Sequence, residues 1–409
     1  MNLLYNLAIN AYATGVRLAS HRNRKAALML AGQANTFNIL TERRIPGERY
    51  VWIHASSLGE FEQGRPLIEM IKRNNPSLKV LLTFFSPSGY EIKKNYTGAD
   101  VICYLPFDKP AIAKRFLDIA RPEMAVFVKY EFWGNYLQEL KQRNIPTYII
   151  SSIFREKQIF FRPWGGLFRK MLACFTHIFV QDEDSRRLLA GININNVTVA
   201  GDTRFDRVTD ILAGCKPFPI VESFTSDSPF TLIIGSSWEP DEDIIIPYFN
   251  AHPDMKLIIA PHEFNKQRLD EMISKIKRPV KLYSQATEDN ISGTDCLIID
   301  CFGILSSCYR YANAAHIGGG FGVGIHNVNE AAVYSIPVTF GPNFSKFREA
   351  RELVACEGAF AVTCKNDFEK IMDRFIADKD FLSTHGNTAG EYIKSHLGAT
   401  KKIYSHIFG

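Results

Sequence analysis

Short runs of Val, Ile, Leu and aromatic residues recur along the chain from residue 50 onward, separated by stretches in which apolar residues return at helical spacing. Runs of the first kind predict strands, and stretches such as 109–120 and 132–143 predict helices. Strands that alternate with helices favour a mostly parallel sheet covered by helices on both faces. The predicted strands form two series, at 50–53, 80–85, 101–105, 124–128, 147–150 and 177–180, and at 230–235, 256–260, 280–283, 296–300, 314–318 and 337–340.

A stretch rich in proline and polar residues separates the two series. It begins at Cys215-Lys216-Pro217-Phe218-Pro219, runs to Ser228-Pro229, and predicts a connection between domains. Because 409 residues are too many for one ordinary domain, two domains are expected. We predict an α/β chain with two Rossmann-like domains that face each other across a cleft. The expected segments are 1–34, 35–212, 213–385, and a C-terminal helix at 386–409 that could return to the first domain.

The first 34 residues combine apolar residues at helical spacing, including Leu3, Leu4 and Leu7, with a basic cluster at 21–25. The apolar part is short and interrupted by polar residues such as Asn6, which is unfavourable for crossing a bilayer. A signal peptide would carry its positive charge before the apolar part, not after it. The pattern favours an interfacial helix on an anionic membrane surface, with an ordinary docked helix as the alternative. Both interpretations place the chain in the cytoplasm, and the first places it on a membrane.

The overall composition narrows the class of protein. A hydrophobic content of 46% with 22% charged residues is typical of a globular protein, and the net charge of +5 is too mild to indicate a nucleic-acid partner. The cysteines show no CxxC pair and no zinc spacing, and we expect them to be buried, reduced thiols. They are Cys103, Cys174, Cys215, Cys296, Cys301, Cys308, Cys356 and Cys364.

The first candidate site follows the first predicted strand. The residues His54-Ala55-Ser56-Ser57-Leu58-Gly59-Glu60 predict a small-residue turn that leads into a helix, with Glu60 near the helix start. Ligands of open α/β sheets bind at the carboxyl ends of strands, so Glu60 is a candidate catalytic carboxylate. The same position suits a residue that merely caps the helix and complements its dipole. This stretch alone does not separate the two interpretations.

Two strand ends of the second series carry candidate anion contacts. Gly235 and Ser236 follow a strand and precede a helix, where backbone N–H groups can bind a phosphate, although a turn required only by geometry is equally compatible. His262 lies at the tip of the next strand, and Arg268, one or two helical turns later, could reach the same anion.

The stretch from Gly318 to Ala332 is the most distinctive. Five glycines occupy seven positions from 318 to 324, which allows a backbone to approach an anion closely. A helix predicted to start near Asn327 would direct free N–H groups at a phosphate, and Glu330 on its first turn could accept from ribose hydroxyls. The spacing differs from the dinucleotide fingerprint. A purely structural loop is the alternative.

Taken in order, these motifs resemble the 3-deoxy-D-manno-octulosonic acid (Kdo) transferase family over nearly the whole chain. The resemblance implies a GT-B fold, CMP-Kdo as the donor, a lipid A precursor as the acceptor and inversion at the anomeric carbon, with no cofactor and no bound metal. It also implies a place at the cytoplasmic face of the inner membrane. The motifs that carry it are 54–60, Tyr130-Glu131-Phe132-Trp133-Gly134-Asn135, Gly201-Asp202-Thr203-Arg204-Phe205-Asp206, Ile234-Gly235-Ser236-Ser237, Pro261-His262 and Gly318–Ala332.

The resemblance also assigns roles to particular positions. Glu60 falls on the general base, and Glu131 on a second acid close to the donor sugar or the acceptor. Small residues around Glu60 lie on the acceptor side, namely Ser56, Ser57 and Gly59. The nucleotide site comprises Gly235, Ser236, His262, Arg268, Gly319, Gly320, Asn327 and Glu330.

Three departures from the family pattern affect anion contacts. Arg204 stands where the family usually has lysine, Pro261-His262 lacks an intervening arginine, and Ser151–Arg155 lacks the usual Asn-Ala-Arg order. Arg155, Arg204 and Arg268 are possible substitutes. A sugar-nucleotide epimerase and a catalytically silent nucleotide-sugar binding protein are the alternative functions, although an intact Glu60 argues against the latter. The number of Kdo residues transferred stays open.

Overall fold

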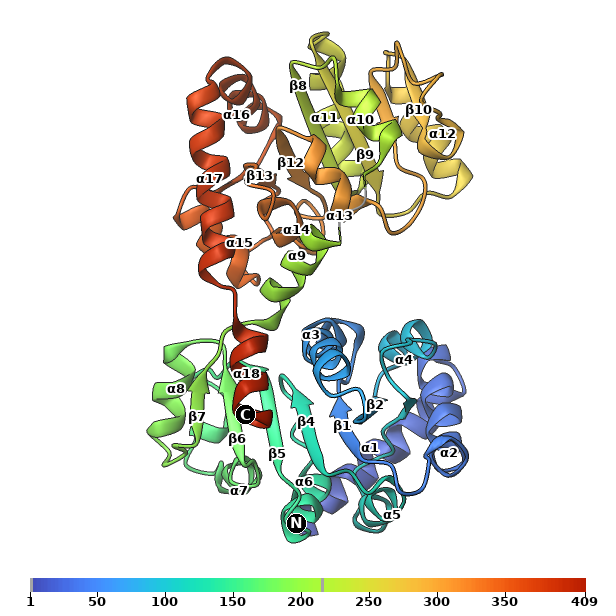
Figure 1. The fold of residues 1–409 in the computed structure, drawn as a ribbon, viewed down its shortest axis with the longest axis vertical. Coiled ribbons are helices and arrows are strands. Elements are labelled where there is room, and N and C mark those ends of the chain that lie inside the picture. Colours follow the sequence, from blue (N-terminus) through green and yellow to red (C-terminus); the bar gives the residue numbers. More distant parts are fainter. Residues whose placement is uncertain (1–2, 215–216) are drawn as a thin grey trace. The chain divides into compact units, whose positions relative to one another are not determined.

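The computed structural model describes residues 3–214 and 217–409, and divides into two units (Figure 1). The first unit extends to Asp206 and also includes Leu397–Gly409, and the second is Arg207–His396. The long helix α9 (Thr203–Ala213) begins in the first unit and ends in the second. Cys215 and Lys216, at the start of the predicted connection, lie outside the described residues, and the rest of that stretch contains the helix α10 (Pro219–Thr225).

The first unit contains a seven-stranded parallel sheet in the order β3-β2-β1-β4-β5-β6-β7. The chain leaves β1 in one direction to form β2 and β3, then returns to its other side with β4, so a topological switch point lies between β1 and β4. The strands are β1 (Tyr50–His54), β2 (Lys79–Phe84), β3 (Val101–Tyr104), β4 (Met124–Val128), β5 (Thr147–Ser152), β6 (His177–Val180) and β7 (Val197–Val199).

Helices cover both faces of this sheet, which explains why its strands are apolar at nearly every position. Trp52 and Phe127 belong to one buried cluster, while Val51, Ile53 and Val126, their neighbours in sequence, belong to another. The remaining helices of this unit are α1 (Leu3–Ser20), α2 (Arg24–Arg43), α3 (Leu58–Asn74), α4 (Pro87–Lys93), α5 (Pro110–Ala120), α6 (Gly134–Gln142), the 3₁₀ turn Ile159–Phe161, α7 (Gly166–Leu172), α8 (Glu183–Ala190) and α18 (Ala399–Phe408).

The basic cluster near the N-terminus forms the start of a second helix. Asn23 caps α2, accepting hydrogen bonds from the N–H groups of Lys25 and Ala26. Further along α2, the Thr36 hydroxyl donates to the Tyr104 carbonyl of β3 at 2.9 Å, which fixes this helix against the edge of the sheet. Among the described residues, no helix has the length and hydropathy required to span a bilayer.

The second unit repeats the architecture with the sheet order β10-β11-β9-β8-β12-β13-β14, again parallel. Its strands are β8 (Phe230–Ser237), β9 (Met255–Pro261), β10 (Val280–Leu282), β11 (Cys296–Ile298), β12 (Ala314–Ile317), β13 (Val338–Phe340) and β14 (Ala359–Ala361). Its helices are α11 (Glu239–Ala251), α12 (Lys266–Lys275), α13 (Leu305–Cys308), α14 (Asn329–Ala332), α15 (Arg348–Ala355), α16 (Lys365–Ala377) and α17 (Lys379–Ser395), with 3₁₀ turns at Tyr283–Gln285 and Tyr309–Tyr311.

The predicted strands are all present, and each end lies within two residues of its prediction. The short strands β7 and β14 were not predicted, because three residues carry too little pattern to be recognised. The described cysteines are free thiols, as expected. The expectation that they are buried holds for Cys103, Cys296 and Cys308 but is wrong for Cys356 and Cys364, which are exposed.

The last helix packs on the first unit, where Ile403 of α18 joins the buried cluster of β1 and α3. A single carboxylate caps the start of this helix. Asp206 Oδ1 accepts from the Gly398 N–H and Asp206 Oδ2 from the Thr400 N–H, each at 2.6 Å. Asp206 therefore ties together segments that are almost 200 positions apart.

We expect Asp206→Ala to lower the free energy of unfolding of the first unit by about 1–2 kcal/mol, because capping residues contribute on this scale. Urea denaturation followed by circular dichroism would measure the loss. Asp118→Ala is the matched control, since Asp118 is about half exposed and pairs only on the surface with Arg143. Equal stability of the two variants would contradict a capping role for Asp206.

Candidate active site

The turn after β1 presents Glu60 in a fixed geometry. Ser57 is the N-cap of α3, with an extended backbone (φ −134°, ψ 174°). Glu60 Oε2 accepts hydrogen bonds from the Ser57 N–H at 3.0 Å and from the Ser57 hydroxyl at 3.4 Å. The capping interpretation of Glu60 is therefore confirmed, and it is compatible with a chemical role because the cap restrains the carboxylate.

The surroundings of Glu60 give it the pKa of a base suited to neutral pH. Burial raises the pKa of Glu60 to about 7, and the negative charge of Glu131 adds to this shift. Three interactions lower the pKa of Glu60 and so oppose this increase. They are the electrostatic interaction with His54, the hydrogen bond from the Ser57 N–H and the electrostatic interaction with Lys129. A carboxylate with a pKa near the operating pH is an effective general base.

Glu131 lies beside Glu60 because β1 and β4 are neighbours. His54, the last residue of β1, pairs in register with Phe127 of β4. Its side chain is fully buried, and His54 Nε2 lies 3.0 Å from Glu131 Oε2. The other ring nitrogen, Nδ1, lies 2.9 Å from the hydroxyl of Thr83 and 3.2 Å from its carbonyl oxygen. His54 thus connects β2, β1 and the segment after β4.

A tryptophan completes the contacts of Glu131. The Trp133 indole N–H donates to Glu131 Oε2 at 2.6 Å and also lies 3.1 Å from His54 Nε2. Trp133 had no predicted role, although it lies within the motif 130–135. Its importance becomes visible only when the ends of β1 and β4 meet.

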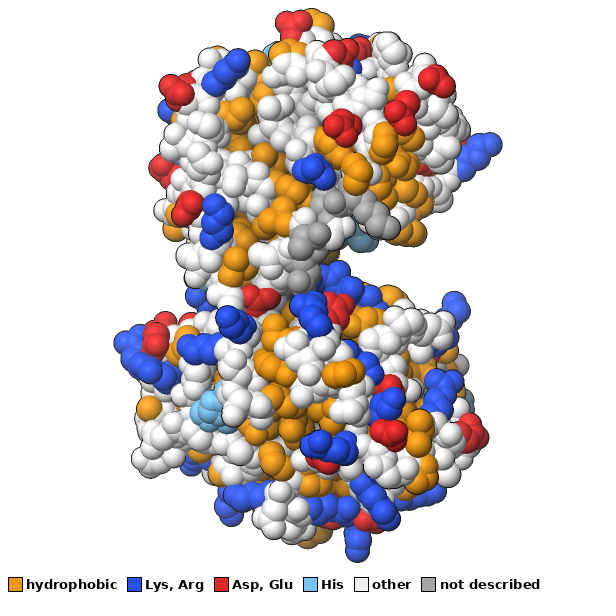
Figure 2. Space-filling view, in the orientation of Figure 1, with side chains coloured by type: hydrophobic (Ala, Val, Ile, Leu, Met, Phe, Trp, Pro, Cys, Tyr) orange, Lys and Arg blue, Asp and Glu red, His pale blue; other side chains and the backbone are white. Residues whose placement is uncertain are grey.

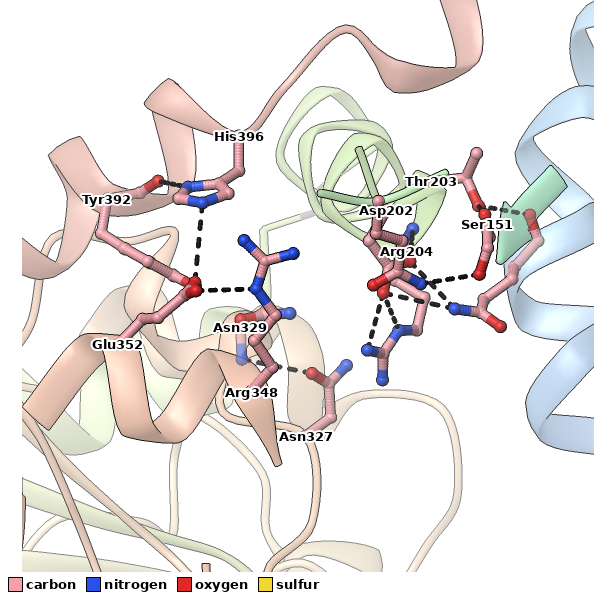
Figure 3. Close-up of polar contacts among 12 residues, drawn as sticks. Ser151, Asp202, Thr203, Arg204, Asn327, Asn329, Arg348, Glu352, Tyr392 and His396 are labelled. Carbon is pink, nitrogen blue, oxygen red and sulfur yellow. Dashed lines mark hydrogen bonds and ion pairs between the residues drawn. The ribbon is translucent and has the colours of Figure 1, made fainter. Parts of the chain in front are cut away.

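A second polar cluster of the first unit lies where α3, the end of β5 and the start of α9 meet (Figure 3). Ser151 has a left-handed backbone (φ 55°), and its hydroxyl lies 3.0 Å from that of Thr203. Thr203 in turn donates to the Gln63 carbonyl oxygen. Asp202 binds the Arg204 guanidinium through Nε at 2.9 Å and Nη2 at 2.7 Å.

These contacts define the environment of two predicted anion contacts. Burial alone would raise the pKa of Asp202, but the charge and hydrogen bonds of Arg204 hold it below its ordinary value. Arg204 is therefore oriented by a buried carboxylate that offsets part of its charge. Arg155 is exposed and lines a cavity of about 730 Å³ near Phe154 and Leu188.

In the second unit, the glycine-rich stretch packs against its neighbours. A Cβ atom on Gly318 would lie 2.4 Å from the Ser236 carbonyl oxygen, and one on Gly320 would lie 2.5 Å from the Gly341 nitrogen. Glycine is thus required at 318 and 320 by backbone packing. The Gly319 N–H, a predicted phosphate donor, already donates to Asp241 at 3.0 Å.

Asp241 organises this edge of the sheet. It is buried and accepts from the Trp238 N–H at 2.9 Å, while His316 Nε2 lies 3.3 Å from its Oδ1. Burial would raise the pKa of Asp241, but His316 and the two N–H groups hold it below its ordinary value. Asp241 therefore fixes the loop after β8 to the loop after β12.

Arg268, which we expect to reach the same anion as His262, is largely buried in an ion pair. It forms an ion pair with the fully buried Glu242, which also accepts from the Ser237 hydroxyl at 2.7 Å. Most of the Arg268 side chain is buried. Among the residues that the structure describes, its Nη1 has no hydrogen-bond partner. An anion at Arg268 would have to reach this nitrogen.

Three rings stack at the carboxyl edge of this sheet. The centroid of His262 lies 4.7 Å from that of Trp238 and 4.6 Å from that of His326. Beside Trp238 is a mainly apolar pocket of about 250 Å³. It is lined by Trp238, Pro240, Asp241, Gly319, Phe321, Gly322 and Val323. His262 and Gly319 thus lie near a pocket, and Trp238 and His326 are ring partners that the sequence did not indicate.

Asn327 and Glu330 are in contact with each other. Asn327 Nδ2 donates to Glu330 Oε1 at 3.0 Å. The Asn329 N–H donates to Asn327 Oδ1 at 3.2 Å (Figure 3). Burial raises the pKa of Glu330. The hydrogen bond from Asn327 and the positive charge of Arg207 lower it, but by less. The helix expected here, α14, is a single turn of four residues, so its dipole contributes less than predicted.

Comparison with known proteins identifies relatives along most of the chain. The family model described as 3-deoxy-D-manno-octulosonic-acid transferase (kdotransferase) matches residues 27–207. The chain is 26% identical over 328 residues to the 3-deoxy-D-manno-octulosonic acid transferase of Aquifex aeolicus, which covers 78% of this chain and 84% of that protein. It is 24% identical over 373 residues to the enzyme of the same name from Haemophilus influenzae, covering 88% and 86%.

Solved structures with the same fold have low sequence identity. UDP-GlcNAc 2-epimerase from Neisseria meningitidis superposes with a TM-score of 0.61 at 15% identity, covering 88% of this chain and 99% of that one. Acinetobacter baumannii MurG gives 0.55 at 12% identity, with coverage of 88% and 99%. These likenesses confirm the predicted GT-B-like fold of two parallel α/β sheets. In sequence, the chain matches the Kdo transferase family of glycosyltransferases, through the family model over residues 27–207 and through relatives that cover most of its length.

Proposed function

We propose that this protein transfers Kdo from CMP-Kdo to a lipid A precursor in lipopolysaccharide core biosynthesis, with Glu60 as the general base and inversion at the anomeric carbon. The observation that carries the proposal is Glu60 itself. In a chain of this family, it is a carboxylate fixed by the Ser57 N–H at the switch point of the sheet, with its pKa raised to about 7. The relatives that cover most of the chain are Kdo transferases, which favours transfer over epimerisation.

The proposed reaction is a single displacement. The acceptor hydroxyl attacks the anomeric carbon of Kdo while Glu60 removes its proton, and the bond from that carbon to the cytidylate phosphate breaks. Because the nucleophile attacks opposite the leaving phosphate, the configuration inverts. Ser56, Ser57 and Gly59 form the turn beside Glu60 and are proposed to contact the acceptor.

Glu131 is proposed to act through its charge. Its carboxylate is held by the indole of Trp133 and by His54, so it cannot turn away from the site. The transition state develops positive charge on the sugar, which a fixed negative charge stabilises. The same charge raises the pKa of Glu60, so that Glu131 serves the base as well.

The donor nucleotide is proposed to bind at the carboxyl edge of the second sheet. Glu330, in the first turn of α14, and Asn327, on the loop before it, are suited to the ribose and the phosphate because both carry polar side-chain atoms. Gly235 and Ser236 lie just before β8 ends at Ser237, and His262, stacked between two rings, directly follows β9. Because the Gly319 N–H is engaged by Asp241, we propose that Gly319 and Gly320 shape the site instead of donating to the phosphate.

The first unit is proposed to lie on the cytoplasmic leaflet of the inner membrane. Leucines of α1 are exposed, with Leu4 at 70% and Leu18 at 69%. Lys and Arg side chains gather along the lower margin of this unit as drawn in Figure 2. Apolar side chains beside basic groups are the combination that binds an anionic lipid surface. A lipid acceptor would be available at such a surface.

An assay with CMP-Kdo generated in place and a tetraacylated lipid A precursor, read by mass spectrometry, tests donor and acceptor together. We expect wild-type protein to add Kdo and Glu60→Gln to lower turnover by about 10²–10⁴-fold, the usual contribution of a general base. Glu69→Gln, on the same helix in a partly exposed pair with Arg65, is the matched control and should retain activity. Near-normal turnover of Glu60→Gln would exclude Glu60 as the base.

The pH dependence provides a second test. The base must be ionised, so kcat/KM should rise with pH through about 7, the pKa of Glu60. Glu131→Gln removes the neighbouring negative charge that raises this pKa, so the ascending limb of its residual activity should move to lower pH. An ascending limb that stays in place would contradict the coupling of the two carboxylates.

Nucleotide binding provides a third test. Glu330→Ala should weaken CMP binding by about 10-fold or more, as expected for the loss of hydrogen bonds to a charged group. Isothermal titration calorimetry measures this directly, and Glu60→Gln should bind CMP as the wild type does. The control is Glu369→Ala, which removes a surface carboxylate from α16. Unchanged CMP affinity of Glu330→Ala would contradict the ribose role.

A further inference from the structure

Helix α1 has two different faces. Its outer face carries exposed leucines, with Leu3 at 74% and Leu7 at 55% exposure. Its inner face directs Tyr5, Asn6 and Tyr12 at the first unit. The inner face contacts the segment that follows Glu131, through two separate sets of side chains.

The first set joins Tyr5 to the start of α6 through a buried carboxylate. Asp108 is fully buried, and the Tyr5 hydroxyl donates to its Oδ2 at 2.5 Å. The same carboxylate accepts from the N–H groups of Asn135 and Tyr136, each at 2.9 Å. The Gly134 N–H donates to the Tyr5 oxygen at 3.0 Å. The first N–H groups of α6 are therefore capped by Asp108 and by α1, both distant in sequence.

The Tyr5 hydroxyl also limits the cost of burying this charge. Burial raises the pKa of Asp108, while the hydrogen bonds from Tyr5 and from the two α6 N–H groups stabilise its ionised form. Removing the hydroxyl would leave the Gly134 N–H and one carboxylate oxygen less well satisfied in a buried position. Buried polar groups without partners are costly, so the start of α6 would shift to relieve them.

The second set is aromatic. The Tyr12 ring lies 6.3 Å from Phe85 and 5.8 Å from Phe107, measured between centroids. Phe85 packs against the Trp133 ring at 4.6 Å. Trp133 is also the N-cap residue of α6. It directly precedes the residues whose N–H groups donate to Tyr5 and Asp108. Both sets therefore converge on Trp133.

Trp133 passes this restraint to the proposed active site, since its indole N–H donates to Glu131. We propose that α1 is a positioning element of the active site, in which Tyr5, through Asp108 and the start of α6, holds Trp133 so that Glu131 is fixed beside His54. Tyr5 is a positioning residue and touches no substrate. The kinetic part of this inference rests on the proposed function, while the structural part does not.

The kinetic experiment compares Tyr5→Phe with wild type. We expect kcat for Kdo transfer to fall on the order of 10-fold, because small displacements of catalytic groups cost rate steeply. KM for CMP-Kdo should stay unchanged, since the donor site is placed in the second unit. Tyr248→Phe is the matched control, because it removes a hydroxyl bonded to Asp373 at 2.7 Å within the second unit. A kcat of Tyr5→Phe within twofold of wild type would overturn the inference.

A spectroscopic experiment separates this inference from the proposed function. In protein labelled with ¹⁵N-tryptophan, the indole N–H resonance of Trp133 can be assigned by its loss in Trp133→Phe. Tyr5→Phe should move this resonance and leave those of Trp164 and Trp238 in place. If wild type transfers no Kdo, the proposed function fails, and the Trp133 resonance still decides whether α1 positions this side chain. An unmoved resonance overturns the inference.

A second variant covers the case in which Tyr5→Phe does not fold. Tyr12 is 48% exposed, so we expect Tyr12→Leu to fold, and this variant removes the ring that contacts Phe85 and Phe107. This variant should shift the same Trp133 resonance by a smaller amount, because the Asp108 contacts are intact. An unmoved Trp133 resonance in folded Tyr12→Leu would overturn the inference in that case.

Discussion

The pair of carboxylates at the ends of β1 and β4 is the constraint on which the active site depends. Two negative charges in a partly buried place repel each other, and the repulsion, added to burial, raises the pKa of Glu60 to about 7. The arrangement is stable because Glu131 is bound by Trp133 and His54, while Glu60 is bound by the Ser57 N–H. Glu60 and Glu131 come together because β1 and β4, the parallel strands on either side of the switch point, are neighbours in the sheet. The fold therefore sets the pKa of Glu60.

In the second unit, the buried carboxylates are paired with basic side chains instead of with each other. Asp241 lies 3.3 Å from His316 Nε2, Glu242 forms an ion pair with Arg268, and the two carboxylates hold loops together. This pairing compensates for the burial of both carboxylates. It also occupies the Gly319 N–H and most of the Arg268 guanidinium. The Gly319 N–H and the Arg268 guanidinium therefore serve the packing of the loops after β8 and β12.

The sequence predicted the features that depend on local pattern and left out those that depend on distant contacts. Strands, their alternation with helices and the position of Glu60 follow from periodicity and turn chemistry within about ten residues. The role of His54 does not, because its partners Thr83 and Glu131 lie 29 and 77 positions away. The glycine-rich stretch was recognised, but its glycines were assigned to a ligand, whereas Gly318 and Gly320 are required by neighbouring backbone. Composition alone does not distinguish these two reasons for a glycine.

The N-terminal helix shows how one segment can meet two demands. One face of α1 exposes leucines, and the other packs Ala13 and Tyr12 on the first unit. Asn6 interrupts the apolar pattern, which argued against a membrane span, and the structure supplies a reason for its presence. Its side chain accepts from Asn135 at 3.0 Å, next to the Tyr5–Asp108 contact. Tyr5 and Asn6, two of the polar residues of α1, thus join this helix to the segment that carries Glu131.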